Sequence, residues 1–154
     1  VARLKGEKPP LLVDVSLALD FVDLSPGLFD SERSACLPYD YVDEEIHSTG
    51  IHRRLAEATD VQELKRLGEE LADRYGKLPE AVRNLIDLAK LRILAAQRGI
   101  ARIEVKRGFA TYFDAATRAA LPFAREATRV EGSTAGARLR SMHRFLTASV
   151  PLHQ

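Results

Sequence analysis

The sequence has little of several features, and each shortage excludes a class of protein. Its one cysteine, Cys36, cannot form an internal disulfide, and neither Cys nor His lies near it at zinc-site spacing, which favours a reducing, cytoplasmic compartment. Its apolar runs are far shorter than the roughly 18 residues needed to cross a bilayer, and no signal peptide opens the chain. It lacks a Gly-x-x-x-x-Gly-Lys-Ser/Thr loop, so we do not expect an NTPase.

Length and composition predict one soluble domain with a real core. The chain has 154 residues, of which 45% are hydrophobic and 29% charged, enough to bury about 70% of the surface that the unfolded chain exposes. The opening run VARLKGEKPP predicts a linker over residues 1–10 from an upstream domain, so we expect a piece of a larger protein. We expect the domain itself to span residues 11–114, followed by an Arg-rich C-terminal extension over 115–154.

Hydrophobic periodicity predicts an α+β fold. The expected elements are a strand over 13–21, a loop over 22–38, helices over 43–58, 60–76 and 79–99, a hairpin of 100–106 with 109–113, and a closing helix from about 133. The Arg107-Gly108 pair supplies the hairpin turn. The short connection between the second and third helices makes them neighbours. The prediction is a small sheet, built from the N-terminal strand and the hairpin, packed against three to four helices.

Local signals set the expected ends of the helices. Asp60 and Glu63 form a variant capping box, Gly76 ends the second helix in a left-handed cap, and Pro79 is suited to the first position of the third. In the first helix, Gly50 costs about 1 kcal/mol relative to alanine. That helix therefore needs tertiary support or a close approach to another backbone at this point. Its predicted apolar face consists of Ile46, Ile51, Leu55 and Ala58.

The histidines and acidic residues do not predict a catalytic or metal site. His47 and His52 follow a run of acidic residues, but five positions on a helix rotate the second imidazole about 140° away from the first. The two rings therefore face different directions, and we expect no metal and no catalytic residue in this chain.

The charge is unevenly distributed along the chain. Residues 1–114 carry 17 basic and 20 acidic side chains, whereas residues 115–154 carry six arginines and two glutamates. Such arginines can neutralise phosphates, and Arg138, Arg140 and Arg144 are the candidates for that contact. The same composition is also typical of a solvated helix face.

Three charged residues at the end of the second helix form a candidate partner surface. Glu70, Asp73 and Arg74, the charged triad below, are spaced i, i+3, i+4 and share one helical face. Asp73 lies near the negative end of the helix dipole, which disfavours an exposed carboxylate by about 0.3 to 1 kcal/mol. Its charge is compensated either locally, by Lys77, a neighbour of Arg74 or water, or by a protein partner.

A family resemblance favours the partner. The run ELADRYGKLP, with LPYDYVDEE and IHRRLAEA before it and LAAQRGIARIEV after it, resembles the C-terminal domain of bacterial transcription-repair coupling factors over roughly residues 38–105. Its motif is Glu-Leu-x-Asp-Arg-Phe/Tyr-Gly-x-Leu-Pro. Where family members usually have Arg and Tyr in the first helix, this chain has Ser48 and His52, with Gly50 between them.

The resemblance implies a role within a larger machine. The full protein would be an ATP- and Mg-dependent DNA translocase of the helicase superfamily 2 type that removes stalled RNA polymerase from double-stranded DNA and recruits UvrA. This domain would be a non-catalytic, autoinhibitory module that folds back on the UvrB-like N-terminal module, with no cofactor, small-molecule ligand or membrane contact of its own. The charged triad occupies the family positions implicated in that contact. Structural roles are better explanations for Tyr75, Gly76, Leu78 and Pro79.

Overall fold

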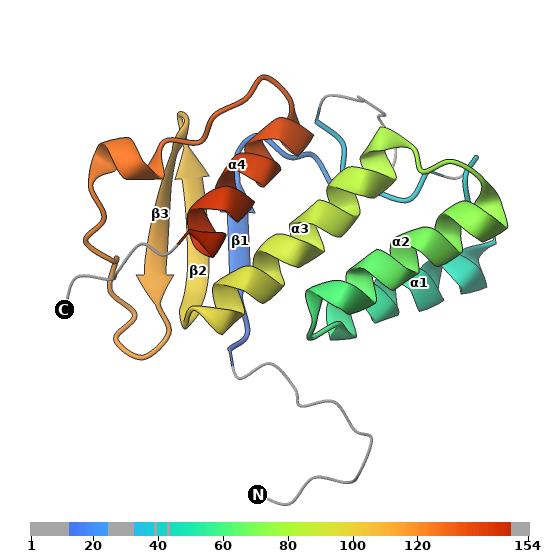
Figure 1. Ribbon diagram of the computed structural model, residues 1–154, viewed down its shortest axis with the longest axis horizontal. Helices are drawn as coiled ribbons and strands as arrows, with labels where there is room; N and C mark the ends of the chain where they lie inside the picture. Colours follow the sequence, from blue (N-terminus) through green and yellow to red (C-terminus); the bar gives the residue numbers. More distant parts are fainter. Residues whose placement is uncertain (1–12, 25–32, 39, 43, 149–154) are drawn as a thin grey trace, which may run out of the picture.

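The computed structural model describes residues 13–24, 33–38, 40–42 and 44–148 and confirms the α+β class (Figure 1). The expected linker over 1–10 lies outside these residues. The elements are β1 (Ser16–Leu19), α1 (Glu45–Glu57), α2 (Val61–Tyr75), α3 (Glu80–Gln97), β2 (Ile100–Lys106), β3 (Phe109–Asp114), the 3-10 helix η1 (Arg125–Thr128) and α4 (Ala135–Thr147).

The three strands form one sheet in the order β1-β2-β3. β1 runs parallel to β2, with Leu17 opposite Ile103, and β2 and β3 form the antiparallel hairpin. The turn residues Arg107 and Gly108 have φ values of 53° and 83°, and positive φ at both positions is what a two-residue type I′ turn requires. In β2, Ile103 and Val105 are buried while Arg102 is exposed, so one face of the sheet carries the core.

Helix α3 lies between two apolar clusters. On one side it packs with the sheet and α4, and on the other with α1 and α2. Figure 1 shows α3 and α4 across the same face of the sheet, with α2 beside α3 and running in the opposite direction. The predicted neighbourhood of the second and third helices is therefore confirmed.

The C-terminal part of the described chain packs on the sheet. Helix α4 begins beyond Thr134, whose hydroxyl accepts a hydrogen bond from the backbone N–H of Ala137 at 3.1 Å. Its Leu139 and Met142 are almost fully buried in the sheet-side cluster. Phe123 and Phe145 contact Tyr112 with ring centroids 5.8 and 5.0 Å away. The segment after residue 114 thus shares its core with the sheet.

One expectation for the first helix was wrong, and the structure decides between the two alternatives for Gly50. Ile46 is 76% exposed, because it lies five positions before the buried Ile51 and therefore about 140° around the helix from it. Ile51, Leu55 and Ala58 form the buried stripe as expected. A Cβ built on Gly50 would meet nothing within 4 Å, so no other backbone approaches it. Burial of the stripe supplies the tertiary support instead.

The ends of α2 and α3 largely follow their sequence signals. Asp60 Oδ1 accepts a hydrogen bond from the Gln62 N–H at 2.6 Å, whereas the Glu63 carboxylate accepts the N–H of Thr59 at 3.2 Å and not that of Asp60. Gly76 has φ 93°, which confirms its left-handed φ, although its ψ of −176° is extended. Pro79 is the N-cap of α3, one residue before the expected position.

Candidate interdomain interface

The charged triad lies on α2 because the opposite side of this helix is buried. Leu64, Leu67 and Leu71 pack into the cluster with α1 and α3. The last two turns of α2 consequently present Glu70, Asp73 and Arg74 at the surface, where all three side chains are exposed. The predicted placement on the exposed side of the helix is confirmed.

Glu70 already has a cationic partner inside the domain. Arg54 of α1 donates to both of its carboxylate oxygens, at 2.5 and 3.3 Å, while the two side chains remain 49% and 54% exposed. This hydrogen bonding to Arg54 lowers the pKa of Glu70. Glu70 is thus a fixed, ionised carboxylate at the surface of the α1–α2 pair.

Asp73 and Arg74 carry charges that the described part of the chain does not pair. Within residues 13–24, 33–38, 40–42 and 44–148, neither side chain forms a hydrogen bond or an ion pair. The Arg74 guanidinium carbon lies 5.5 Å from the centre of the Tyr75 ring, and the Arg74 charge adds to the lowering of the Glu70 pKa without forming an ion pair. The local ion pair considered for Asp73 is not formed with any described residue. Both charges are available to a partner.

The end of α2 that carries the triad is held in place by aromatic residues. The Tyr41 hydroxyl lies 3.1 Å from the Leu71 carbonyl and 2.9 Å from that of Gly76, to which it can donate. The Tyr41 and Tyr75 ring centroids are 5.7 Å apart, and the Tyr75 hydroxyl lies 3.4 Å from His47 Nδ1. Leu78 packs against the helical cluster. These contacts orient the final turn of α2.

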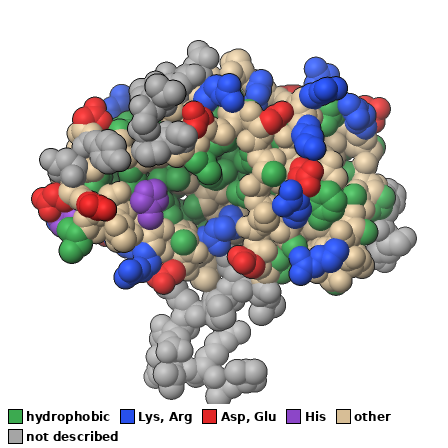
Figure 2. All heavy atoms as spheres, turned by 180° about the vertical axis from the view of Figure 1, so that it is seen from behind, with side chains coloured by type: hydrophobic (Ala, Val, Ile, Leu, Met, Phe, Trp, Pro, Cys, Tyr) green, Lys and Arg blue, Asp and Glu red, His purple; other side chains and the backbone are tan. Residues whose placement is uncertain are grey.

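Ser48 and His52 lie on the other flank of α1. They line an apolar groove together with Cys36, Leu85 and Leu88, whereas Arg54 and Glu70 line a separate hollow. Figure 2 shows apolar side chains gathered in the middle of the face opposite that of Figure 1, with charged groups around them. The two departures from the family pattern therefore do not adjoin the charged triad.

The candidate phosphate-binding arginines of α4 do not converge. Arg138 Nε donates to the Gly132 carbonyl at 2.9 Å, while Arg140 lies 3.8 Å from Asp87 on α3. Two positions along a helix separate their side chains by about 200°. Arg144 is exposed one turn beyond Arg140. The three guanidiniums therefore form no common surface.

The described residues offer neither a metal-binding cluster nor a membrane-spanning helix. No group of three or more His, Cys, Asp or Glu side chains there could hold a metal ion. No described helix is both long enough and apolar enough to span a membrane.

Two residues that shape the candidate interface were not predicted from the sequence. Arg54 contacts Glu70 across two helices, and Tyr41 contacts the end of α2 from 30 residues away. No spacing rule predicts such contacts, because they depend on how the segments pack. Helical spacing instead offers Arg54 a local partner, Glu57, three positions later in the same helix.

Comparison with known proteins agrees with the fold and the motif. The TRCF domain model matches residues 32–122, more than half of the chain. Transcription-repair-coupling factor of Escherichia coli K12 is 32% identical over 104 residues, covering 68% of this chain and 8% of the relative, and that of Mycobacterium tuberculosis is 41% identical over 71 residues, covering 46% and 6%. The chain thus spans less than a tenth of these relatives.

A solved structure shares the architecture. The crystal structure of the C-terminal domain of transcription-repair coupling factor superimposes with a TM-score of 0.61, at 16% identity, over 90% of this chain and 97% of that one. At this identity the likeness concerns the fold, while the family model concerns the sequence. Together they show that the chain belongs to the TRCF domain family.

Proposed function

We propose that this domain is a non-catalytic regulatory module that restrains its parent protein through a reversible contact between the charged triad and the UvrB-like N-terminal module. In this proposal the contact covers the UvrA-binding surface until RNA polymerase is engaged. ATP, Mg and the motor's grip on double-stranded DNA belong to other domains, and the whole protein acts in the cytoplasm.

The observation that carries the proposal is that Asp73 and Arg74 have no charged partner within the described residues. They are adjacent, exposed, opposite in charge and unpaired within the described residues. Water hydrates both charges in the free domain, but Asp73 opposes the helix dipole. A partner with complementary charges would compensate both at once, and charge complementarity of this kind fixes the register of an interface.

Glu70 differs from Asp73 and Arg74 because its side chain is already held by a neighbour. Because Arg54 holds its carboxylate through two hydrogen bonds, Glu70 is already oriented when a partner arrives. A carboxylate can accept further hydrogen bonds beside those of Arg54, since its two oxygens offer about four lone-pair sites. Arg54 is therefore a positioning residue for the contact.

The expected binding free energy of the charged triad is small, as a contact that must open requires. Exposed ion pairs contribute about 0 to 1 kcal/mol each. The triad alone therefore supplies specificity and modest affinity, and neither the fold of the domain nor that of its partner depends on it. Occupation of the parent's motor by polymerase can then compete with the contact.

The test measures binding of the 154-residue chain to the separately produced UvrB-like module by isothermal titration calorimetry. We expect Asp73→Ala and Arg74→Ala to weaken binding by up to about fivefold each, the equivalent of about 1 kcal/mol. Added salt should weaken the wild-type complex, because the charges are exposed.

Glu69→Ala is the matched control. Glu69 lies beside Glu70 on α2 but lines the groove toward α3 and α4. Loss of this carboxylate should leave the affinity unchanged. Equal effects of the control and of the triad variants, or no binding by the wild-type chain, would reject the proposal.

The alternative, nucleic-acid binding through Arg138, Arg140 and Arg144, has less support. Arg138 points away from Arg140 and Arg144, and Arg140 already lies beside Asp87. Duplex DNA binding that disappears in Arg140→Ala and Arg144→Ala variants would favour this alternative over the contact proposed above.

A further inference from the structure

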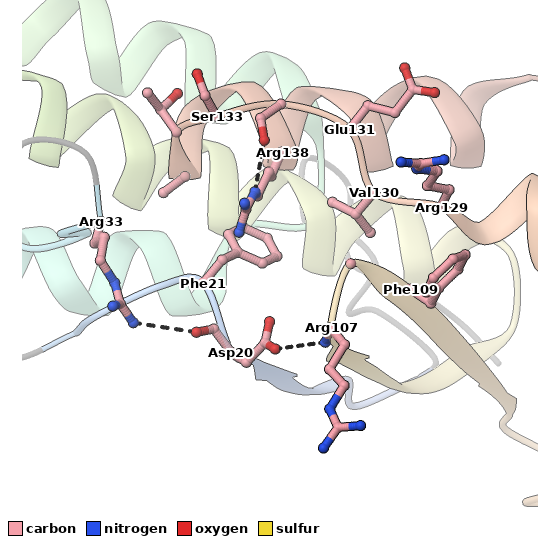
Figure 3. A pocket seen from close by; sticks show the side chains of 14 residues that line it. Asp20, Phe21, Arg33, Arg107, Phe109, Arg129, Val130, Glu131, Ser133 and Arg138 are labelled. Atoms are coloured by element: carbon pink, nitrogen blue, oxygen red, sulfur yellow. Dashed lines mark hydrogen bonds between the residues drawn. The ribbon is translucent and has the colours of Figure 1, made fainter.

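A cavity of about 800 Å³ lies where β1, the hairpin turn and the start of α4 meet (Figure 3). Four arginines line it, and each comes from a different segment. Arg33 belongs to the chain after β1, Arg107 to the hairpin turn, Arg129 to the segment before α4, and Arg138 to α4 itself. The fold thus gathers positive charge from positions that are far apart in the sequence.

The charges of these four arginines are unpaired, unlike those of three other arginines in the domain. Arg54, Arg102 and Arg140 each lie within 4 Å of a carboxylate. Within the described part of the chain, none of the four cavity arginines forms such an ion pair.

The two carboxylates at the cavity do not neutralise this charge. Asp20 Oδ2 accepts the backbone N–H of Arg107 at 3.0 Å, and Glu131 forms no ion pair with a described residue. Counting four cations and two anions among the lining residues leaves a surplus of positive charge. No further carboxylate among the described residues lines the cavity, so an anion from outside could balance this surplus.

Neighbouring groups orient two of the guanidiniums. Arg138 Nε donates to the Gly132 carbonyl at 2.9 Å, and its guanidinium carbon lies 5.7 Å from the centre of the Phe21 ring. Arg33 Nη2 lies 3.4 Å from the Asp20 carbonyl, to which it donates. In Figure 3 these two side chains come from different walls of the cavity, while Arg107 starts at its rim and points away from them. The remaining N–H groups stay free for a ligand.

We propose that this cavity binds phosphate groups, supplied either by the backbone of a nucleic acid or by a free polyphosphate. Guanidinium groups match phosphate geometry through paired N–H donors and remain charged at all physiological pH values. Several cations around one opening favour a ligand that carries several negative charges close together. The site is independent of the charged triad, because it is built from the sheet end and α4 and not from α2.

Binding is tested on the intact 154-residue chain. Fluorescence anisotropy measures how tightly the chain binds a labelled DNA duplex of about 20 base pairs, and the matching single strand, at about 50 mM salt. In a second arm inorganic tripolyphosphate is added as a competitor of the labelled probe. In a third arm poly-glutamate, a polyanion without phosphate, is added in its place. Binding of tripolyphosphate in calorimetry, with no binding of either labelled nucleic acid, assigns the site to a free polyphosphate. Nucleic-acid binding that is lost when the cavity arginines are replaced assigns the site to a backbone.

The decisive variant combines Arg33→Ala, Arg107→Asn and Arg129→Ala. Asparagine is chosen at position 107 because the backbone there has φ 53°, which Asn tolerates. Each neutralised phosphate of a duplex contributes about 0.9 to the salt slope, so losing three contacts should lower that slope by about 2.7. Arg138 is retained because it also supports the local fold.

A second triple variant removes the same charge elsewhere. It combines Arg53→Ala, Lys65→Ala and Arg66→Ala, all exposed positions on α1 and α2. We expect its salt slope and phosphate affinity to match those of the wild type. Equal losses in both triple variants, equal affinity for poly-glutamate and for the phosphate probes, or no binding of any phosphate probe would overturn the proposal.

Discussion

The ion pair between Arg54 and Glu70 makes a quantitative prediction for a double-mutant cycle with Arg54→Ala, Glu70→Ala and the double variant. Both side chains are about half exposed, at 49% and 54%, so solvent screens their attraction. The two-point geometry places the coupling toward the upper part of the range for exposed pairs, about 0.5 to 1 kcal/mol. With a urea dependence of about 2 kcal/mol/M, a coupling of 0.7 kcal/mol corresponds to a midpoint change of about 0.35 M.

The pH dependence gives this prediction a second readout. The pKa of Glu70 is lowered in the folded state by its hydrogen bonds to Arg54. The pair therefore stabilises the fold above the ordinary carboxyl pKa of 4.5, and the stabilisation disappears as the pH falls through the lower folded value. Urea unfolding at pH 7 and at pH 3 measures the coupling, and carbon-detected NMR follows the Glu70 carboxyl directly.

Two results would refute this reasoning. A coupling that stays constant from pH 7 down to complete protonation of Glu70 would show that the ionised carboxylate is not its source. An unchanged Glu70 pKa in Arg54→Ala would show that Arg54 does not hold the carboxylate in solution.

Three further predictions concern stability. Leu139→Ala should lower the free energy of unfolding by about 2 to 5 kcal/mol in urea titrations because Leu139 is fully buried, whereas Ile46→Ala, at a residue 76% exposed, should change it little. Gly50→Ala should raise the melting temperature, since a Cβ there meets nothing within 4 Å and helix propensity improves by about 1 kcal/mol, while Gly76→Ala should lower it because φ is 93°. Burial lowers the pKa of His143 from 6.5 to about 4, so stability should fall as the pH drops from 6.5 toward 4, and His143→Gln should lose that dependence; an unchanged pH profile in this variant would contradict it.

The parts of the fold that depend on neighbours in sequence were predictable. The Asp60 cap, the positive φ of Gly76 and the Arg107-Gly108 turn each follow from the chemistry of a few adjacent residues. The alternation along 13–21 identified the strand, but pairing shortened it to Ser16–Leu19, because only these residues align with β2. The parallel pairing itself could not be read from sequence, since it depends on how the chain crosses over the intervening helices.

The candidate interface, too, was predictable only where it depends on neighbours in sequence. Helical spacing placed Glu70 and Asp73 at the surface, because the leucine stripe marks the buried side. Spacing could not show that Arg54 engages one of these carboxylates and leaves the other unpaired. The arginine-lined cavity was equally hidden, since its four arginines meet only through the tertiary fold.

The position of α3 between the two apolar clusters affects how the domain responds to mechanical load. Leu91 contributes to the sheet-side cluster and Ile93, two residues later, to the helical one. A displacement of α2, where a docking partner would pull, cannot be absorbed by α1 and α2 alone, because the shared helix transmits it toward the sheet. We therefore expect the domain to transmit force as a rigid unit. Tension applied to α2 should reach the sheet through α3 without unfolding α3.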